Sequence, residues 1–243
     1  MAITLALDLY GTLFNTSGIG EELTRFTGGE ELADIFARTW REKQIEYSFR
    51  RGLMRQYAPF NVCIRDALEF ACFAHKLDLS ETDKEYLLEI YRKLPLFADV
   101  RHSLEDLADD PAFRLFILSN GYPDDLDNLL INAGIKHFFE SVVSVDEIRS
   151  FKPNPEVYEH FLKRAGSVVD ETWMVSGNTF DFIGAISFGF HGAFVKRSTD
   201  VLVDPWEIEP SITINNLLEL KPEILCFYNK SVPNDSISIG DAD

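Results

Sequence analysis

The sequence predicts an α/β fold in which a doubly wound parallel sheet carries an inserted, all-helical cap subdomain. Two observations predict the sheet. Short apolar runs recur along the chain, each bounded by Gly, Asn or Asp, as buried parallel strands are. Helical stretches separate these runs, and such alternation is typical of doubly wound sheets. The insertion is predicted by residues 19–94, which contain helical patterns but no convincing strand.

The elements of the sheet follow one another in a regular order. Strands are expected at 3–8, 113–118, 141–145, 172–176 and 192–196. Helices are expected between them at 123–134, 155–165 and 179–188. The first strand ends at Asp8 and is followed by the turn residue Gly11, so the chain leaves the sheet at that point.

Apolar residues recur at helical spacing within the insertion, which predicts several amphipathic helices. The clearest sets are Leu32, Ile35, Phe36 and Trp40; Leu68, Phe70, Ala71 and Ala74; and Leu87, Leu88 and Tyr91. Ser17 and Gly18 begin the insertion, and Pro95 closes it. The expected division is an α/β core over 1–16 and 95–222, a cap over 17–94, and a partly disordered tail over 223–243.

The composition excludes several classes of partner. Forty acidic against 23 basic residues give a net charge of −17 and a pI near 4.6. Such a surface disfavours nucleic acid and anionic membranes. No apolar run reaches transmembrane length, and Asp8 comes too early for a signal peptide. We therefore expect a soluble, cytoplasmic protein whose partner is a small molecule.

The cysteines and histidines predict neither a disulfide framework nor a zinc site. The three cysteines are far apart and form no C-x-x-C pair, and the five histidines lack ligand spacing. The five histidines are therefore expected to be surface residues or hydrogen-bonded core residues.

Polar residues gather where the predicted strands end, which is where ligands bind in an open parallel sheet. These residues are Asp8 and Thr12 after the first strand, Ser119 and Asn120 after the second, Lys152 and Tyr158 after the third, and Ser176, Asn178 and Asp181 after the fourth. One edge of the sheet thus combines two carboxylates, one lysine and several neutral hydrogen-bonding groups.

Four of these patterns resemble the motifs of the haloacid dehalogenase superfamily: D-x-Y-G-T-L from Asp8, S-N-G from Ser119, K-P at Lys152 and S-x-N-x-x-D from Ser176. Residues 40–47 resemble the cap-helix segment of the L-2-haloacid dehalogenases. Each motif alone is weak, but five in register over residues 4–197 are strong.

The resemblance implies a Rossmann-like core with a helical cap, no cofactor, no metal and a homodimer. It also implies a hydrolase that converts short L-2-haloacids to D-2-hydroxyacids and halide through an aspartyl ester, with inversion at C2.

Asp8 is the expected nucleophile. A carboxylate attacks poorly when it is solvated, so Asp8 must lie in a dry site, held by donors such as Thr12 and Lys152. The alternative for Asp8 is an aspartate that caps a helix or a turn. The alternative for Lys152 is a solvated lysine in a loop.

The leaving halide and the substrate carboxylate need donors, and the resemblance assigns this role to Ser119 and Asn120 from the core. Arg41, in the predicted cap helix, is the expected main halide acceptor. Its alternative is an ordinary surface arginine on an amphipathic helix.

Asp181, with Ser176 and Asn178, is expected to activate the water that opens the ester. As an alternative, Asp181 stabilises the first turn of a helix. Tyr158 is expected to orient its neighbours, or else to be a core tyrosine. The residues expected to line the substrate pocket are Leu9, Tyr10 and Phe180, together with Arg41, Ser119 and Asn120.

Two alternatives to dehalogenation stay open. Phosphatases of the superfamily carry a second aspartate where this chain has Tyr10, and a magnesium-binding carboxylate where it has Gly177. A tyrosine with its usual pKa of about 10 is a poor general acid. Halide leaves as a stable anion and needs neither group. The other alternative is a catalytically idle binding protein. The presence of Asp8, Lys152 and Asp181 argues against it.

Overall fold

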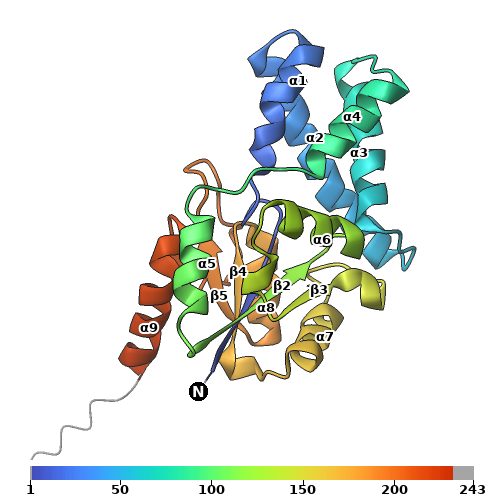
Figure 1. Ribbon diagram of the computed structural model, residues 1–243. Coiled ribbons are helices and arrows are strands. Elements are labelled where there is room, and N and C mark those ends of the chain that lie inside the picture. The colour runs from blue at the N-terminus through green and yellow to red at the C-terminus, as the bar shows by residue number, and fades with distance from the viewer. Residues whose placement is uncertain (1, 232–243) are drawn as a thin grey trace, which may run out of the picture.

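The computed structural model describes residues 2–231 and confirms the predicted fold class (Figure 1). Six parallel strands form one sheet in the order β3-β2-β1-β4-β5-β6. Their bounds are β1 Ile3–Leu7, β2 Phe113–Ser119, β3 Ser141–Ser144, β4 Thr172–Ser176, β5 His191–Val195 and β6 Ile212–Ile214. The order reverses between β1 and β4, so the carboxyl ends of these central strands form the switch point where ligands bind.

Helices cover both faces of the sheet. They are α5 Val100–Ala108, α6 Pro123–Asn132, α7 Pro155–Ala165, α8 Thr179–Phe188 and α9 Leu220–Ser231. In Figure 1, α5 and α9 lie together on one side of the sheet. Every residue of β1 and β4 is buried, so these strands are mostly apolar and do not alternate between apolar and polar residues.

The insertion is helical throughout, as the sequence predicts. It contains α1 Gly20–Thr27, α2 Glu30–Leu53, α3 Phe60–His75 and α4 Glu81–Tyr91, which project beyond one end of the sheet in Figure 1. The Trp40 indole is buried between α2 and α3 and donates to the Ile64 carbonyl at 2.8 Å. A capping box of Ser80 and Asp83 starts α4.

The predicted tail over 223–243 is wrong at its beginning. Helix α9 extends to Ser231, Ile224 is fully buried, and Phe227 packs edge-on against Trp173 at 5.0 Å. Pro222 obscures this helix in the sequence, but it lies in the first turn, where its missing N–H is not needed. Residues 232–243 lie outside the described part of the chain.

Within residues 2–231, no helix combines the length and the apolar composition that a membrane span requires.

Candidate active site

Asp8 leaves β1 at the switch point and is 4% exposed. Lys152 donates to its Oδ1 at 2.7 Å. Its Oδ2 accepts from the Thr12 hydroxyl at 2.7 Å and from the Asn178 amide at 2.8 Å. The backbone N–H of Asp8 donates to Val175 of β4 at 3.0 Å. Asp8 is therefore a dry carboxylate surrounded by donors, as a nucleophile must be.

Lys152 is fully buried and lies between two carboxylates. Its ammonium donates to Asp8 at 2.7 Å, to Asp181 at 2.8 Å and to the Leu118 carbonyl at 3.0 Å. Burial lowers the pKa of Lys152, but the two carboxylates outweigh burial and leave the pKa raised. The ammonium therefore stays charged and neutralises this part of the site.

Asp181 lies in the first turn of α8 and is completely buried. Its Oδ2 accepts from Lys152 and from the Ser176 hydroxyl, both at 2.8 Å, whereas Oδ1 has no partner among the described residues. Burial, together with the charge of Asp8, raises the pKa of Asp181 to about 7, although Lys152 opposes the shift. Asp181 therefore takes up a proton more readily than a free aspartate does.

Arg41 reaches from α2 into the core. Its Nη2 donates to the Tyr10 carbonyl at 3.3 Å and to Asn178 Oδ1 at 3.4 Å. Its Nη1 donates to Tyr91 and Gln44 at 3.3 and 3.2 Å. An ordinary surface arginine would make none of these contacts with the sheet edge.

The other predicted residues take different places. Ser119 is buried and its hydroxyl accepts from Gly121 N–H at 3.1 Å, so it holds its own turn. Asn120 Oδ1 accepts from the backbone N–H of Lys152 at 2.9 Å. Tyr158 is buried and donates to the backbone carbonyl of Asp181 at 3.2 Å. It thus contacts Asp181 through the backbone alone.

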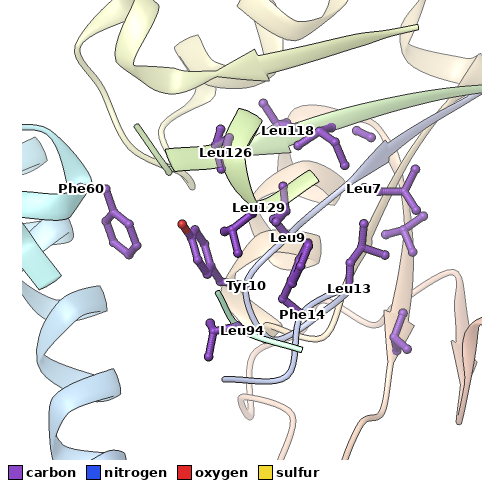
Figure 2. Close-up of a cluster of buried hydrophobic side chains, with 14 of the residues drawn as sticks. Leu7, Leu9, Tyr10, Leu13, Phe14, Phe60, Leu94, Leu118, Leu126 and Leu129 are labelled. Carbon is purple, nitrogen blue, oxygen red and sulfur yellow. The ribbon is translucent and has the colours of Figure 1, made fainter. Parts of the chain in front are cut away.

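The apolar residues expected around the substrate lie at the boundary between sheet and insertion. Figure 2 shows Tyr10 between the core leucines and Phe60 of α3. Tyr10 stacks on Tyr91 at 5.7 Å, and Leu9 is fully buried. Phe180 packs edge-on against Phe49 of α2 at 5.2 Å. A cavity of about 200 Å³ adjoins Tyr10 and Tyr91.

Gln44 and Tyr91 are polar groups of this site that the sequence did not single out. Gln44 is fully buried, and its Oε1 accepts from the Tyr91 hydroxyl at 2.7 Å, while its Nε2 has no partner among residues 2–231. It lies one turn after Trp40 on the apolar stripe of α2. A polar residue on the apolar stripe of a helix is unusual, and this feature of the sequence could have identified Gln44 as a candidate site residue.

The residues do not fit a divalent cation. Magnesium prefers several hard oxygen ligands, but Lys152 donates to Asp8 Oδ1, and Asn178 and Arg41 both donate to the Tyr10 carbonyl. Of the carboxylate oxygens of Asp8 and Asp181, only Asp181 Oδ1 has no partner among the described residues. A Cβ at Gly177 would lie 2.4 Å from the Gly11 carbonyl oxygen, so no carboxylate can replace this glycine without moving the turn. Among residues 2–231, no cluster of three or more His, Cys, Asp or Glu could hold a metal.

Comparison with known proteins agrees with this geometry. A family model described as haloacid dehalogenase-like hydrolase matches residues 4–189. "(S)-2-haloacid dehalogenase 2" of Pseudomonas sp. (strain CBS-3) is 37% identical over 92% of this chain and 95% of its own. "Haloacetate dehalogenase H-2" of Moraxella sp. (strain B) is 34% identical over 79% of this chain and 85% of its own.

A solved structure is also similar. It is the L-2-haloacid dehalogenase of Xanthobacter autotrophicus with chloropropionic acid covalently bound, 30% identical, with a TM-score of 0.85 over 93% of this chain and 99% of that one. The family model covers most of the chain, and the alignments with these relatives cover between 79% and 93% of it. The chain therefore belongs to the haloacid dehalogenase-like hydrolases.

Proposed function

We propose that this chain hydrolyses short L-2-haloacids to D-2-hydroxyacids and halide, with Asp8 as the nucleophile. The observation that carries the proposal is the buried Asp8 carboxylate, held by Lys152, Thr12 and Asn178 with Arg41 beside it. The names of the relatives and the covalently bound chloropropionic acid in the Xanthobacter structure support the same chemistry.

The first step forms an ester. An Asp8 oxygen attacks C2 of the substrate as the carbon–halogen bond breaks, and the halide departs with the bonding electrons on the opposite face. Attack from the back inverts C2, so an L-2-haloacid gives a D-2-hydroxyacid. Arg41 and Asn120 accept the halide in this scheme, and Ser119 supports the substrate carboxylate. Neither a general acid nor a metal is needed, because halide is a stable anion.

The second step opens the ester. Water attacks Cγ of Asp8, and Asp181 takes one proton of this water. The Cγ bond to the product oxygen then breaks, Asp181 returns its proton to that oxygen to give the hydroxyl, and the other proton of the water leaves the Asp8 carboxyl group for solvent. Ester formation removes the negative charge of Asp8, which is one cause of the raised pKa of Asp181. Lys152 then has Asp181 as its remaining carboxylate partner, so the pKa of Asp181 falls when a base is required.

A single turnover in heavy-oxygen water, with enzyme in excess, tests this scheme. We expect the label in Asp8 and an unlabelled product hydroxyl, because water attacks the aspartyl carbonyl and not C2. Mass spectrometry of the peptide that contains Asp8 gives the answer. Labelled product beside an unlabelled peptide would instead show direct attack of water on C2.

Residues 17–94 act in this proposal as a cap that contributes Arg41 to the site. Arg41→Lys keeps the charge but loses the planar fork that bonds Tyr10, Asn178 and Tyr91 at once. We expect kcat/KM for halide release to fall by about 10²-fold, on the scale of one lost transition-state donor. Arg38→Lys, an exposed position on the same helix, serves as the control. Wild-type kinetics in Arg41→Lys would show that the arginine is structural.

The proposed activity requires no divalent metal. Donors surround Asp8, and an acidic side chain at position 177 would collide with the Gly11 carbonyl oxygen. Dialysis against a chelator is therefore expected to leave halide release from L-2-chloropropionate unchanged. p-Nitrophenyl phosphate serves as a parallel substrate. Loss of activity that magnesium restores, or turnover of the phosphate ester, would favour the phosphatase.

The protein is also proposed to be cytoplasmic and homodimeric. Its three cysteines, Cys63, Cys72 and Cys226, are all free, which suits a reducing compartment.

The support for a homodimer is an exposed apolar surface. Ile35 of α2 and Phe73 of α3 expose apolar side chains that a second copy would cover, with Phe73 81% exposed.

A further inference from the structure

Arg197 follows the carboxyl end of β5 and reaches the turn that carries Thr12. Its Nε and Nη2 both donate to the Thr12 carbonyl oxygen, at 3.0 and 2.7 Å. Its Nη1 donates to both carboxylate oxygens of Asp99, at 2.8 and 2.7 Å. The guanidinium also lies 4.1 Å from the centre of the Phe97 ring. The side chain of Arg197 is 10% exposed, and it contacts Thr12, Asp99 and Phe97.

Asp99 connects this arginine to the rest of the core. It immediately precedes α5, and its Oδ2 also accepts from the Leu217 N–H at 2.6 Å. The planar fork of an arginine can serve Asp99 and the Thr12 carbonyl at the same time, which a lysine cannot do. The pair therefore fixes the turn after β1 against two other segments of the core.

Thr12 transmits this fixation to Asp8. Its hydroxyl oxygen accepts from Gly177 N–H at 2.8 Å and donates to Asp8 Oδ2 at 2.7 Å. A hydroxyl has one proton, so the contact with Gly177 leaves that proton for Asp8. Arg197 thus holds the backbone of the residue whose side chain holds the nucleophile.

We propose that Arg197, anchored by Asp99, is a positioning residue that sets the place of the Asp8 carboxylate through Thr12. The inference rests on the proposed function, because it concerns the nucleophile of that reaction. A shift of the turn would move the Asp8 oxygen relative to C2 of the substrate, and a misplacement of about 1 Å can cost ~10²-fold in rate.

Arg197→Lys is the direct test. We expect kcat for halide release to fall by at least about tenfold while KM changes little, because Arg197 acts through Thr12 and does not contact the substrate. Asp99→Asn, which keeps the size of the side chain but removes its charge, is expected to act in the same direction. Thermal melting of each variant separates loss of activity from loss of fold.

Arg114→Lys is the matched control. Arg114 makes a similar planar pair with Glu140, at 3.0 and 2.7 Å, and lies over the Phe116 ring. It is the second residue of β2, at the end of the strand opposite to Ser119. We expect its kcat to match the wild type. Wild-type kcat in Arg197→Lys would overturn the proposal.

A double-mutant cycle with Thr12→Val tests the route. If Arg197 acts through Thr12, the lysine substitution should have little further effect on kcat once the hydroxyl is absent. Effects that multiply fully in the double variant would instead show that Arg197 supports the fold alone.

Amide hydrogen exchange supplies a readout that needs no substrate. The peptide covering residues 9–14 should exchange faster in Arg197→Lys than in the wild type or in Arg114→Lys. Unchanged exchange would overturn the positioning role. Failure of the wild type to release halide would sink the proposed function alone, since exchange still decides the role of Arg197.

Discussion

Asp8→Asn is expected to reduce halide release by at least about 10⁴-fold, the scale seen when an enzyme loses its nucleophile. The amide nitrogen and oxygen are poor nucleophiles and cannot form the aspartyl ester. The fold should survive, because Lys152 keeps Asp181 as a carboxylate partner at 2.8 Å. We expect the melting temperature to shift by only a few degrees.

The control for this variant is Asp127→Asn, which removes a surface carboxylate paired with Lys136. It should retain full activity, since its pair is exposed and lies on α6 away from the site. Mass spectrometry of the Asp8→Asn protein after long incubation with substrate should show no added mass at residue 8. Substantial turnover by a cleanly prepared Asp8→Asn protein would remove Asp8 from the nucleophile role.

Those parts of the fold that follow from local pattern could be predicted from the sequence. The strand before Asp8 is a buried apolar run that ends in a turn, and helix 155–165 has a proline at its start and a glycine at its end. Such signals are local and strong. The bounds that the sequence predicts for helix α7 are therefore the same as the observed bounds.

Three elements of the core, α5, β6 and α9, were not predicted, and two of them, β6 and α9, lack a local signal. Strand β6 has three residues, and α9 contains Pro222 in its first turn, so neither shows enough periodicity to be recognised. Both are fixed by tertiary contacts: β6 pairs with β5, and α9 packs on Trp173. Burial of this kind depends on the whole sheet and cannot be read from twelve residues of sequence.

The site divides in the same way. The motifs placed Asp8, Lys152 and Asp181 at one edge, and the structure brings them within hydrogen-bonding distance. The partners of Gln44 and Arg197 depend on how the helical insertion and the turn after β1 meet the sheet. These contacts join residues that are far apart in the sequence, such as Arg197 and Thr12. No rule of sequence spacing reveals them.

Lys152→Met is expected to abolish most activity and to make stability depend on pH. Methionine is unbranched and one atom shorter than lysine, and it removes the charge that lies between Asp8 and Asp181. We expect halide release to fall by at least about 10²-fold, since one charged donor to the nucleophile and to the developing charge is lost. The activity assay should be run from pH 5 to pH 8.

The effect on stability follows from the two carboxylates. Without the ammonium, Asp8 and Asp181 are buried near each other, and both burial and mutual repulsion raise their pKa values in the folded protein. In the unfolded chain an aspartate titrates near pH 3.9. The folded variant therefore binds more protons than the unfolded chain between that pH and the raised pKa values, and its stability falls as the pH rises through this window.

Thermal melting measures this slope. The wild type already carries a raised pKa of about 7 at Asp181 and should itself lose stability between pH 5 and pH 8. Lys152→Met should lose much more, with a cost at pH 8 of about 3–5 kcal/mol, as when one partner of a buried pair is removed. Lys136→Met, which removes an exposed lysine, should follow the wild-type slope. A Lys152→Met protein whose melting temperature stays parallel to the wild type from pH 5 to pH 8 would show that the ammonium does not oppose the rise in the pKa values of these two carboxylates.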